Sequence, residues 1–289
     1  MFKITEDELN KILPQDGPTI SEVKKYLEKY NKEYIVIKCG GSVLVNQKLF
    51  NNFIKNISIL NQLGFNPIVI HGGGKKISEK LNENGIQSDF VNGLRVTDEK
   101  SIKIVEEVLN SFNKDITDAL EKNACASQGI SNRKKNIITV TQEHEKLGFV
   151  GIPQEINHYI IEKVIEEKKV PVIAPLGLDN KNRVYNINAD TVASAIAKKL
   201  NARRLIIMSD VEGVLDANKN LILEINTQKV RELIEKKIIS GGMIPKIQNC
   251  LDVANNGVKG VVIIDGRKNH SILYELLSDE GSGTLIRKE

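Results

Sequence analysis

The stretch YIVIKCGG at residues 34–41 and the stretch PIVIHGGG at residues 67–74 decide the fold class of this chain. Each is a short apolar run that is followed at once by two or three glycines. An unbroken apolar run is typical of a parallel strand that is buried on both faces. Glycine at the end of such a strand lets the backbone approach a ligand, and ligands of open α/β sheets bind at this edge.

Outward from these two stretches, predicted strands and predicted helices alternate along the chain. Strands are predicted over residues 34–38, 67–71, 137–141, 170–174, 205–209 and 260–265. Amphipathic helices are predicted over residues 47–63, 98–122, 156–167, 190–200, 228–236 and 245–255. Segments 142–153 and 177–186 interrupt this pattern and are predicted to be hairpins or loops. The alternation predicts an α/β protein, a three-layer α/β/α sandwich around a mainly parallel sheet.

Length and composition exclude several classes of protein. The chain has 289 residues, of which 40% are hydrophobic and 27% charged, as in an ordinary globular protein with a sizeable core. The 41 basic and 37 acidic side chains nearly balance at a net charge of +4, and aromatic residues make up 4% without any tryptophan. A nucleic-acid partner is therefore not predicted, because it would require a basic patch or aromatic side chains that stack on bases.

Neither a membrane span nor secretion is predicted. No apolar run reaches the ~20 residues of a membrane-spanning helix. The acidic N-terminal stretch MFKITEDELN lacks the apolar region of a signal peptide. The three cysteines and four histidines lie far apart and do not have the spacing of metal ligands. We therefore expect a cytoplasmic protein without a structural metal ion.

The first 31 residues differ from the rest, and we predict that they form a helical arm. Thr5 with Glu8, and Thr19 with Glu22, have the spacing of a capping box, so each pair predicts the start of a helix. The second helix carries an apolar stripe of Ile20, Val23, Leu27 and Tyr30. This stripe is expected to pack either on its own domain or on another subunit.

Two glycine-rich turns are candidates for anion binding. Lys38 ends the first strand and is followed by Gly40 and Gly41, and Gly73 and Gly74 follow the second strand, ahead of a helix. Free backbone N–H groups at the start of a helix bind anions. The alternatives are a glycine turn without a ligand and a lysine that reaches solvent. The spacing matches neither the dinucleotide fingerprint nor the P-loop of nucleotide-binding proteins.

Further polar and charged residues follow three later points of the chain. They are Asn186, Asn188 and Asp190, then Asp210, Val211 and Gly213, and then the motif GGMIPK at residues 241–246. Capping of the helix over 190–200 is the alternative function of the first group. Lys246 lies in the first turn of a helix, where a lysine opposes the helix dipole and so indicates an anionic partner. Amides and lysines at the ends of parallel strands are the parts with which phosphoryl transfer holds nucleotide phosphates.

Six motifs stand in a fixed order along the chain: KCGG at 38–41, HGGG at 71–74, GLRVT at 93–97, NINAD at 186–190, SDVEGV at 209–214 and GGMIPK at 241–246. In this order they resemble the amino acid kinase family over residues 32–287. GLRVT and GGMIPK favour the members that phosphorylate the side-chain carboxylate of N-acetyl-L-glutamate in arginine biosynthesis. The resemblance implies this reaction and the fold of the family.

The resemblance also implies roles for individual residues in catalysis. Lys38 and Lys246 would flank the transferring phosphoryl group, and Asp190 would hold both lysines by ion pairs. Backbone N–H groups would be offered to the phosphate and to the reacting carboxylate by Gly40, Gly41, Gly73 and Gly74. No general base is implied, because the attacking carboxylate is already ionised at pH 7.

The same resemblance assigns the two binding sites. Arg95 would bind the α-carboxylate of the substrate with its planar guanidinium, and Asn186 and Asn188 would complete that pocket. ATP would be bound by Lys38, Gly40, Gly41, Asp210, Val211, Gly213 and Lys246. Mg²⁺ would be carried by the nucleotide phosphates and water, without a protein ligand.

Regulation and assembly are implied as well. Arginine-inhibited members carry an extra N-terminal helix that joins dimers into a hexamer, and the helix predicted after residue 19 resembles it. Glu275 and Gly281 match the segment that binds arginine, whereas Val262 stands where a histidine is common. The resemblance therefore implies a homohexamer, a trimer of dimers, that L-arginine inhibits. Docking of a nitrogen-signalling protein on this ring stays open.

Within this expectation the chain consists of an arm, residues 1–31, and one kinase domain, residues 32–289. The domain would have a substrate-binding lobe over about 32–187 and an ATP-binding lobe over about 188–289. Cys39 and Lys75 stand where tyrosine and proline are common in the family. Alternatives are a kinase for another carboxylate, such as glutamate or an aminoadipate-type compound, and a non-catalytic arginine sensor. A nucleotide-dependent oxidoreductase is disfavoured because the dinucleotide fingerprint is missing.

Overall fold

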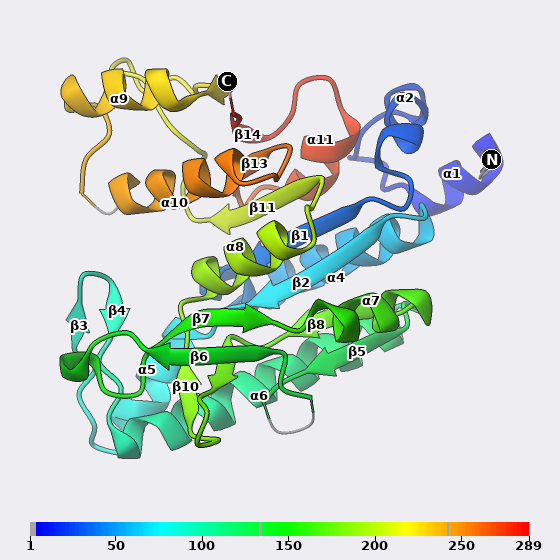
Figure 1. Cartoon of the computed structure of the whole chain (residues 1–289). Coiled ribbons are helices and arrows are strands. Elements are labelled where there is room, and N and C mark those ends of the chain that lie inside the picture. Colours follow the sequence, from blue (N-terminus) through cyan, green and yellow to red (C-terminus); the bar gives the residue numbers. More distant parts are fainter. Residues whose placement is uncertain (1–3, 133–134, 242, 289) are drawn as a thin grey trace.

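The core of the fold is an eight-stranded sheet with the order β12-β14-β13-β11-β1-β2-β8-β5 (Figure 1). It is seen in a computed structural model, which describes residues 4–132, 135–241 and 243–288. In sheet order the strands are β12 (Glu224–Ile225), β14 (Gly283–Ile286), β13 (Val261–Asp265), β11 (Arg204–Ser209), β1 (Tyr34–Cys39), β2 (Asn66–His71), β8 (Val170–Ile173) and β5 (Ser127–Ile130). The strands from β13 to β5 are parallel to one another, and β14 is antiparallel to β13. The prediction of a mainly parallel sheet is confirmed.

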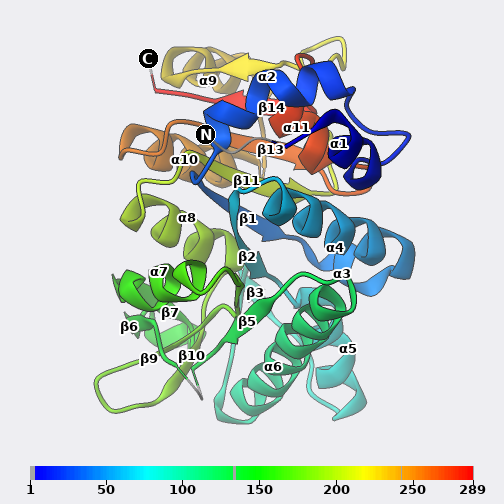
Figure 2. The ribbon, with the colours of Figure 1, turned by 90° about the vertical axis from the view of Figure 1, so that its right-hand side faces the viewer.

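Helices cover both faces of this sheet, which confirms the three-layer sandwich (Figure 2). Ile35 and Ile37 of β1 point into one apolar cluster and Val36 points into the other, as the alternation of a strand requires. The cluster of Ile35 contains side chains of α1 (Glu6–Ile12), α2 (Ile20–Tyr30), α4 (Gln47–Gln62), α6 (Glu99–Lys122) and α11 (Ser271–Leu277). The cluster of Val36 contains side chains of α7 (His158–Glu166), α8 (Ala189–Lys199), α9 (Thr227–Glu235) and α10 (Met243–Asn255). Among the helices of the described residues, none is both long enough and apolar enough to cross a membrane.

A second, four-stranded sheet lies outside the main sheet and has the order β10-β9-β6-β7. Its strands are β6 (Ile138–Gln142), β7 (Gly151–Ile156), β9 (Leu176–Leu178) and β10 (Val184–Asn186). The hairpins predicted at 142–153 and 177–186 are confirmed, since β6 pairs antiparallel with β7, through the 3₁₀ turn Glu145–Leu147, and β9 pairs antiparallel with β10. The helix predicted over 156–167 starts later, at His158, because Ile156 still belongs to β7.

The strand predicted over 137–141 forms, but its expected place in the parallel sheet is wrong. Its side chains alternate between buried Ile138 and Val140 and exposed Thr139, so this strand, β6, has only one apolar face. A half-buried strand suits an antiparallel hairpin better than a sheet covered on both faces. The place at the edge of the main sheet is taken by β5, which the sequence analysis missed because SQGI contains a single large apolar residue.

The N-terminal arm packs on its own chain. Both capping boxes are present, with Thr5 and Glu8 at the start of α1 and Thr19 and Glu22 at the start of α2. Leu9, Val23 and Tyr30 are fully or almost fully buried in the core cluster of Ile35. Figure 2 shows α2 above α11 at the edge of that layer. Of the two alternatives for the apolar stripe, packing on its own domain is the one found.

Candidate functional site

The two glycine-rich turns lie side by side at the carboxyl ends of β1 and β2. These strands are parallel neighbours in register, with Cys39 opposite His71. The first turn leads into α3 (Gly41–Val45) and the second into α5 (Gly74–Glu83). A Cβ atom on Gly41 would lie 3.8 Å from the backbone N of Gly74, so the turns are in contact. At Gly40 a Cβ atom would come within 3.1 Å of the Met208 carbonyl oxygen of β11, so this turn packs closely against β11.

The start of α5 presents free N–H groups to a cavity. Its N-cap residue, Gly73, has no side chain to accept from these groups, and its first turn carries no acidic residue. A Cβ atom on Gly73 would collide with Leu109, at 2.9 Å from Cδ2, whereas one on Gly74 would meet nothing within 4 Å. The backbone at Gly74 is therefore open to a ligand. Uncapped N–H groups and the positive end of the helix dipole are suited to bind an anion.

A buried histidine holds the second turn in place. His71 is fully buried, and burial lowers its pKa to about 4, so its ring is neutral at pH 7. Nε2 lies 3.2 Å from the amide nitrogen of Asn113 and accepts its hydrogen bond. Nδ1 therefore carries the proton and donates to the Gly72 carbonyl oxygen at 3.1 Å. This structural role of His71 is not predictable from the sequence, because its partner Asn113 is distant in sequence.

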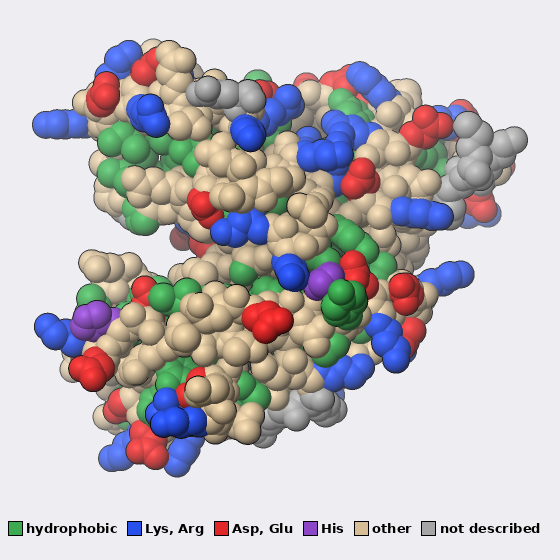
Figure 3. Space-filling model, viewed as in Figure 1, with side chains coloured by type: hydrophobic (Ala, Val, Ile, Leu, Met, Phe, Trp, Pro, Cys, Tyr) green, Lys and Arg blue, Asp and Glu red, His purple; other side chains and the backbone are tan. Residues whose placement is uncertain are grey.

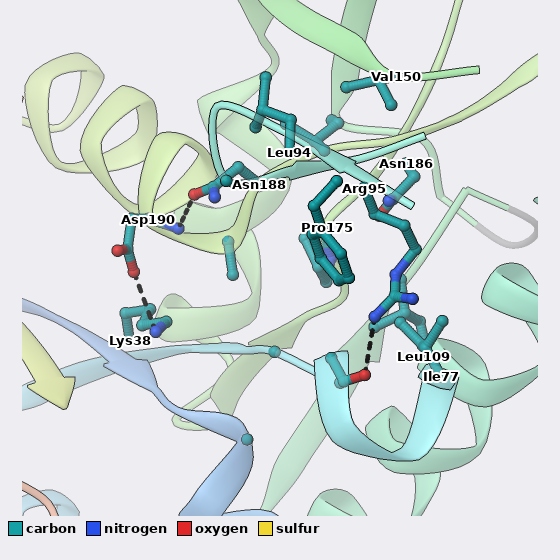
Figure 4. A pocket seen from close by; sticks show the side chains of 18 residues that line it. Lys38, Ile77, Leu94, Arg95, Leu109, Val150, Pro175, Asn186, Asn188 and Asp190 are labelled. Carbon is teal, nitrogen blue, oxygen red and sulfur yellow. Dashed lines mark hydrogen bonds and ion pairs between the residues drawn. The ribbon is translucent and has the colours of Figure 1, made fainter. Parts of the chain in front are cut away.

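One carboxylate joins the two lysines predicted for catalysis. Lys38 Nζ lies 3.0 Å from Asp190 Oδ1, and Lys246 Nζ lies 2.9 Å from Asp190 Oδ2. β1, α8 and α10 thus bring together residues that are far apart in sequence, and Figure 4 shows the pair of Lys38 and Asp190 at the edge of the pocket. Burial alone would raise the pKa of Asp190, but the two ammonium groups outweigh it and lower the pKa below its ordinary value. Asp190 is therefore ionised at neutral pH and fixes both lysines.

A cavity of about 220 Å³ next to Lys38 is lined by Arg95. This arginine is 7% exposed, and its Nη2 donates to the Gly74 carbonyl oxygen and to Ser78 Oγ, both at 2.9 Å. Its Nη1 donates to Ser88 Oγ. Within the described residues no carboxylate lies at ion-pair distance from Arg95, although burial lowers its pKa. A buried guanidinium with neutral partners only is suited to an anionic ligand.

Asn186 and Asn188 line the same cavity. Asn188 also caps α8, since its Oδ1 accepts from the backbone N of Asp190 at 2.8 Å and of Thr191 at 3.2 Å. The capping alternative is therefore confirmed for Asn188, and it fixes the amide at the cavity wall. Asn186 Nδ2 lies 3.5 Å from Thr97 Oγ1, at the limit of a hydrogen bond. The amide of Asn186 is thus weakly engaged by the protein.

A second cavity, of about 520 Å³, adjoins the first. Its walls include the candidate nucleotide residues Lys38, Gly40, Gly41, Asp210 and Lys246, together with Lys75. The set of ammonium and backbone N–H groups fits the oxygens of nucleotide phosphates. Both carboxylate oxygens of Asp190 face lysines, which leaves Asp210 as the carboxylate of this cavity that could face a metal ion carried by a nucleotide.

Two of the predicted nucleotide residues do not line these cavities in the described residues. Val211 packs against the apolar cluster of Val36. Gly213 has φ +144°, and a Cβ atom there would lie 2.5 Å from Thr284 Oγ1 of β14, so this glycine serves the packing of a turn. Gly242 of the motif GGMIPK lies outside the described residues.

The cavities belong to a cleft between two parts of the molecule. Figure 3 shows the surface deeply hollowed between the part with α9 and α10 and the part with the hairpin of β3 (Phe90–Val91) and β4 (Leu94–Arg95). A further cavity of about 750 Å³ is lined from both sides, by Asn92 and Gly93 of the hairpin turn and by Pro245 and Lys246 of α10. A ligand in this cleft would contact both parts.

Glu275 and Gly281 lie together but away from the cleft. Glu275 Oε2 accepts from the backbone N of Ser282 at 3.0 Å, and a Cβ atom on Gly281 would lie 3.3 Å from the same oxygen. Burial raises the pKa of Glu275, while Arg204 and Lys29 act in the opposite direction. Val262, at the position where a histidine is common, is fully buried in the core cluster of Ile35. A partly buried carboxylate beside a tight glycine turn is suited to a cationic ligand.

Comparison with known proteins gives a family for this arrangement. The model of the amino acid kinase family matches residues 33–265. An acetylglutamate kinase of Pelagibacter ubique (strain HTCC1062) is 63% identical over 288 residues, which cover 100% of both chains. The acetylglutamate kinase of Campylobacter fetus subsp. fetus (strain 82-40) is 42% identical and covers 91% of this chain and 94% of its own.

A solved structure shows the same fold at low identity. N-acetylglutamate synthase from Neisseria gonorrhoeae, complexed with coenzyme A and N-acetyl-glutamate, superimposes with a TM-score of 0.84 at 21% identity. The match covers 93% of this chain and 62% of that chain. The fold, the order of the motifs and the identities all agree, and the chain therefore belongs to the amino acid kinase family, in the group of the acetylglutamate kinases.

Proposed function

We propose that this enzyme phosphorylates the side-chain carboxylate of N-acetyl-L-glutamate with ATP, as a step of arginine biosynthesis. A carboxylate oxygen of the substrate would form a bond to the γ-phosphorus of ATP while the bond to the β-γ bridging oxygen breaks, giving the acyl phosphate and ADP. The observation that carries this proposal is Arg95, which is buried in the 220 Å³ cavity with neutral partners only. The names of the full-length relatives support the choice of substrate.

The residues of the cleft would act by position and by charge. Arg95 would pair with the α-carboxylate of the substrate, and Asn186 and Asn188 would border the rest of the molecule. The backbone at Gly74 and the ammonium groups of Lys38 and Lys246 would face the reacting groups, where negative charge develops during transfer. Asp190 would keep the two lysines apart and oriented.

ATP would occupy the 520 Å³ cavity, with Mg²⁺ bound to its phosphates. Gly40 and Gly41 are positioned to contact a phosphate, and Asp210 lines the same cavity. Val211 and Gly213 would then contribute by shaping the turn behind Asp210. In this division of labour, residues 32–187 supply most of the substrate pocket and one wall of the nucleotide site, and residues 188–289 supply the other wall with Met208, Ser209, Asp210 and Lys246. We expect the reaction to take place in the cytoplasm.

A panel of carboxylates tests the proposal. The protein is incubated with ATP, Mg²⁺ and hydroxylamine, which traps an acyl phosphate as a hydroxamate, and with N-acetyl-L-glutamate, L-glutamate or L-2-aminoadipate. We expect hydroxamate from N-acetyl-L-glutamate, and at least about tenfold higher KM for it in the variant Arg95→Lys, because a lysine ammonium group does not reproduce the planar set of donors of the guanidinium. Hydroxamate from another carboxylate but not from N-acetyl-L-glutamate would contradict the proposal.

We further propose that L-arginine inhibits the enzyme by binding near Glu275, and that the active form is a hexamer, a trimer of dimers. The partly buried carboxylate of Glu275 beside Gly281 supports an arginine site, because a guanidinium pairs well with a carboxylate. The hexamer rests on the resemblance of α2 to an assembly helix. Since the apolar stripe of α2 is covered within its own chain, the outer, charged face of the arm would form the contact. A nitrogen-signalling protein would be a further partner of that hexamer.

A further inference from the structure

The ring of Phe90 covers the guanidinium group of Arg95. The Arg95 Cζ atom lies 4.7 Å from the centre of the Phe90 ring, a distance typical of a cation–π contact. The two residues are directly opposite each other in the antiparallel pair of β3 and β4, so both side chains lie on one face of the hairpin. The turn between them has positive φ at Asn92 (51°) and Gly93 (80°), as a tight two-residue hairpin requires. The backbone thus fixes the stacking.

Phe90 is unusual because it is a large apolar residue that is exposed to solvent. Its side chain is 56% exposed, and it lines both the 220 Å³ cavity and the 520 Å³ cavity. Its neighbour Val91 is 47% exposed but is not among the residues that line these two cavities. An aromatic side chain that borders two polar cavities has a reason to be there beyond the core of the protein.

Some N–H groups of the Arg95 guanidinium have no hydrogen-bond partner among the described residues and could donate to a ligand. Three of the five N–H groups of the guanidinium donate to Ser88, Ser78 and the Gly74 carbonyl oxygen. The remaining N–H groups lie in the plane of the guanidinium, and this plane is shielded on one side by Phe90. Shielding removes competing water and restricts rotation of the group, and both effects strengthen a hydrogen-bonded pair with a carboxylate.

We propose that Phe90 is a positioning residue, which holds the Arg95 guanidinium in the plane that receives the substrate carboxylate and keeps water from it. This proposal rests on the proposed function for the identity of the substrate. Phe90 acts through Arg95 on binding. It therefore affects the KM for the carboxylate substrate, whereas kcat and the KM for ATP depend on Lys38, Lys246 and Asp190.

Four variants test this role: Phe90→Ala, Phe90→Leu, Phe90→Tyr and the control Val91→Ala. We expect Phe90→Ala to raise the KM for N-acetyl-L-glutamate about tenfold, which corresponds to about 1.4 kcal/mol, with kcat and the KM for ATP within about threefold of the parent. Phe90→Tyr keeps the ring and stays close to the parent. Phe90→Leu keeps most of the volume but not the ring, so it resembles Phe90→Ala. Val91→Ala, on the same strand, has no effect on either KM.

Three outcomes would overturn the proposal: an unchanged KM in Phe90→Ala, full function of Phe90→Leu, or an equal rise of both KM values, which would indicate a hairpin that has lost its structure. Thermal unfolding of each variant separates the last case. Failure of the proposed function is distinguishable, because it appears in the parent protein as absence of turnover with N-acetyl-L-glutamate. The same variants are then measured with whichever carboxylate of the panel is phosphorylated.

Discussion

At the scale of single residues, Asp190 fixes the positions of two positively charged side chains in the cleft. Its two oxygens lie 3.0 Å from Lys38 Nζ and 2.9 Å from Lys246 Nζ, and no other described carboxylate pairs with these lysines. In Asp190→Asn two ammonium groups would face each other without a counter-charge, so both would move away from the transferring group. We expect kcat to fall about 100-fold, with a smaller change in either KM. Steady-state kinetics with N-acetyl-L-glutamate and ATP measure this.

The matched control for this variant is Asp252→Asn. Asp252 also accepts from a lysine, Lys198, at 2.7 Å, but this pair is exposed and lies outside the cleft. An exposed ion pair contributes ~0–1 kcal/mol to stability, so turnover and thermal midpoint should both stay near those of the parent. A kcat of Asp190→Asn within threefold of the parent would show that the lysines are held by something else.

Lys75 is a second residue with a testable function. It lies in the first turn of α5, where its charge opposes the helix dipole, and no described carboxylate lies within ion-pair distance of it. The next residue, Lys76, pairs with Glu79 at 3.4 Å and does not line either cavity. Because Lys75 lines the 520 Å³ cavity that we propose for ATP, we expect Lys75→Ala to raise the KM for ATP about threefold at low salt and less at high salt. Lys76→Ala is the control, and equal effects of both variants would assign them to the general charge of the surface.

The sequence could predict these residues only in part. Lys38 and the glycines were recognisable because each ends an apolar strand, and parallel strands bring their carboxyl ends together. The pairing of Asp190 with both lysines came from the resemblance, and the structure supplies the distances. Phe90 and His71 were not assigned functions, because their partners Arg95 and Asn113 meet them through a hairpin register and through a contact between β2 and α6. The contact of His71 with Asn113 leaves no spacing in the sequence, whereas Asn92 and Gly93 between Val91 and Leu94 are the typical signal of a two-residue hairpin.

At the scale of elements, the junction of β2 and α5 depends on a neutral histidine. The pKa of His71 is about 4 in the folded chain, below its ordinary value of 6.5. In the pH range between these values the unfolded chain binds more protons than the folded chain, so stability decreases as the pH falls. The decrease begins near pH 6.5 and is complete below about pH 4. From pH 8 to pH 5 this group alone removes about 2 kcal/mol from the free energy of unfolding.

Urea unfolding of the parent and of His71→Gln measures this effect. The absolute stability of the variant is expected to be lower, because glutamine does not reproduce both ring hydrogen bonds. The informative quantity is the difference in unfolding free energy between the two proteins, which should shrink by about 2 kcal/mol from pH 8 to pH 5. A difference that does not change with pH would mean that His71 is not held neutral.

The elements themselves were predicted where a strong period was present. The six helices were found because each has an apolar stripe, and β1, β2, β8, β11 and β13 because they are apolar on both faces. β5, β12 and β14 were missed, since they are short or weakly apolar edge elements whose pairing depends on the sheet already being formed. The misplacement of β6 has the same origin, because a period of two residues identifies a strand but not the sheet that it joins.

At the scale of the whole molecule, the cleft and the segment around Glu275 are separate. The described residues that line the cleft cavities do not include any of α2 or α11, so an inhibitor bound near Glu275 would act from a distance. α11 is followed by β14, which lies in the main sheet beside β13. β13 in turn lies next to β11, and Asp210 follows the end of β11. If the chain assembles as proposed, sedimentation shows a mass about six times the 32.2 kDa of one chain. A species of two chains with full activity and full inhibition would rule out a role for the hexamer.

The proposed binding of L-arginine near Glu275 can be tested without disturbing the cleft. Glu275→Gln keeps an oxygen that can accept from the backbone N of Ser282 but removes the charge that a guanidinium would pair with. We therefore expect the concentration of L-arginine that halves the activity to rise at least about tenfold in this variant. Glu280→Gln, an exposed carboxylate of the same segment, should be inhibited like the parent. Lys29 and Arg204 lie near the site and repel a cationic ligand. In Glu275→Gln this repulsion is no longer offset, so we expect the variant to bind L-arginine more weakly at low salt than at high salt, where the repulsion is screened. Equal inhibition of the parent and of Glu275→Gln would place the site elsewhere, whereas a parent that millimolar L-arginine leaves fully active would show that this chain is not inhibited by arginine.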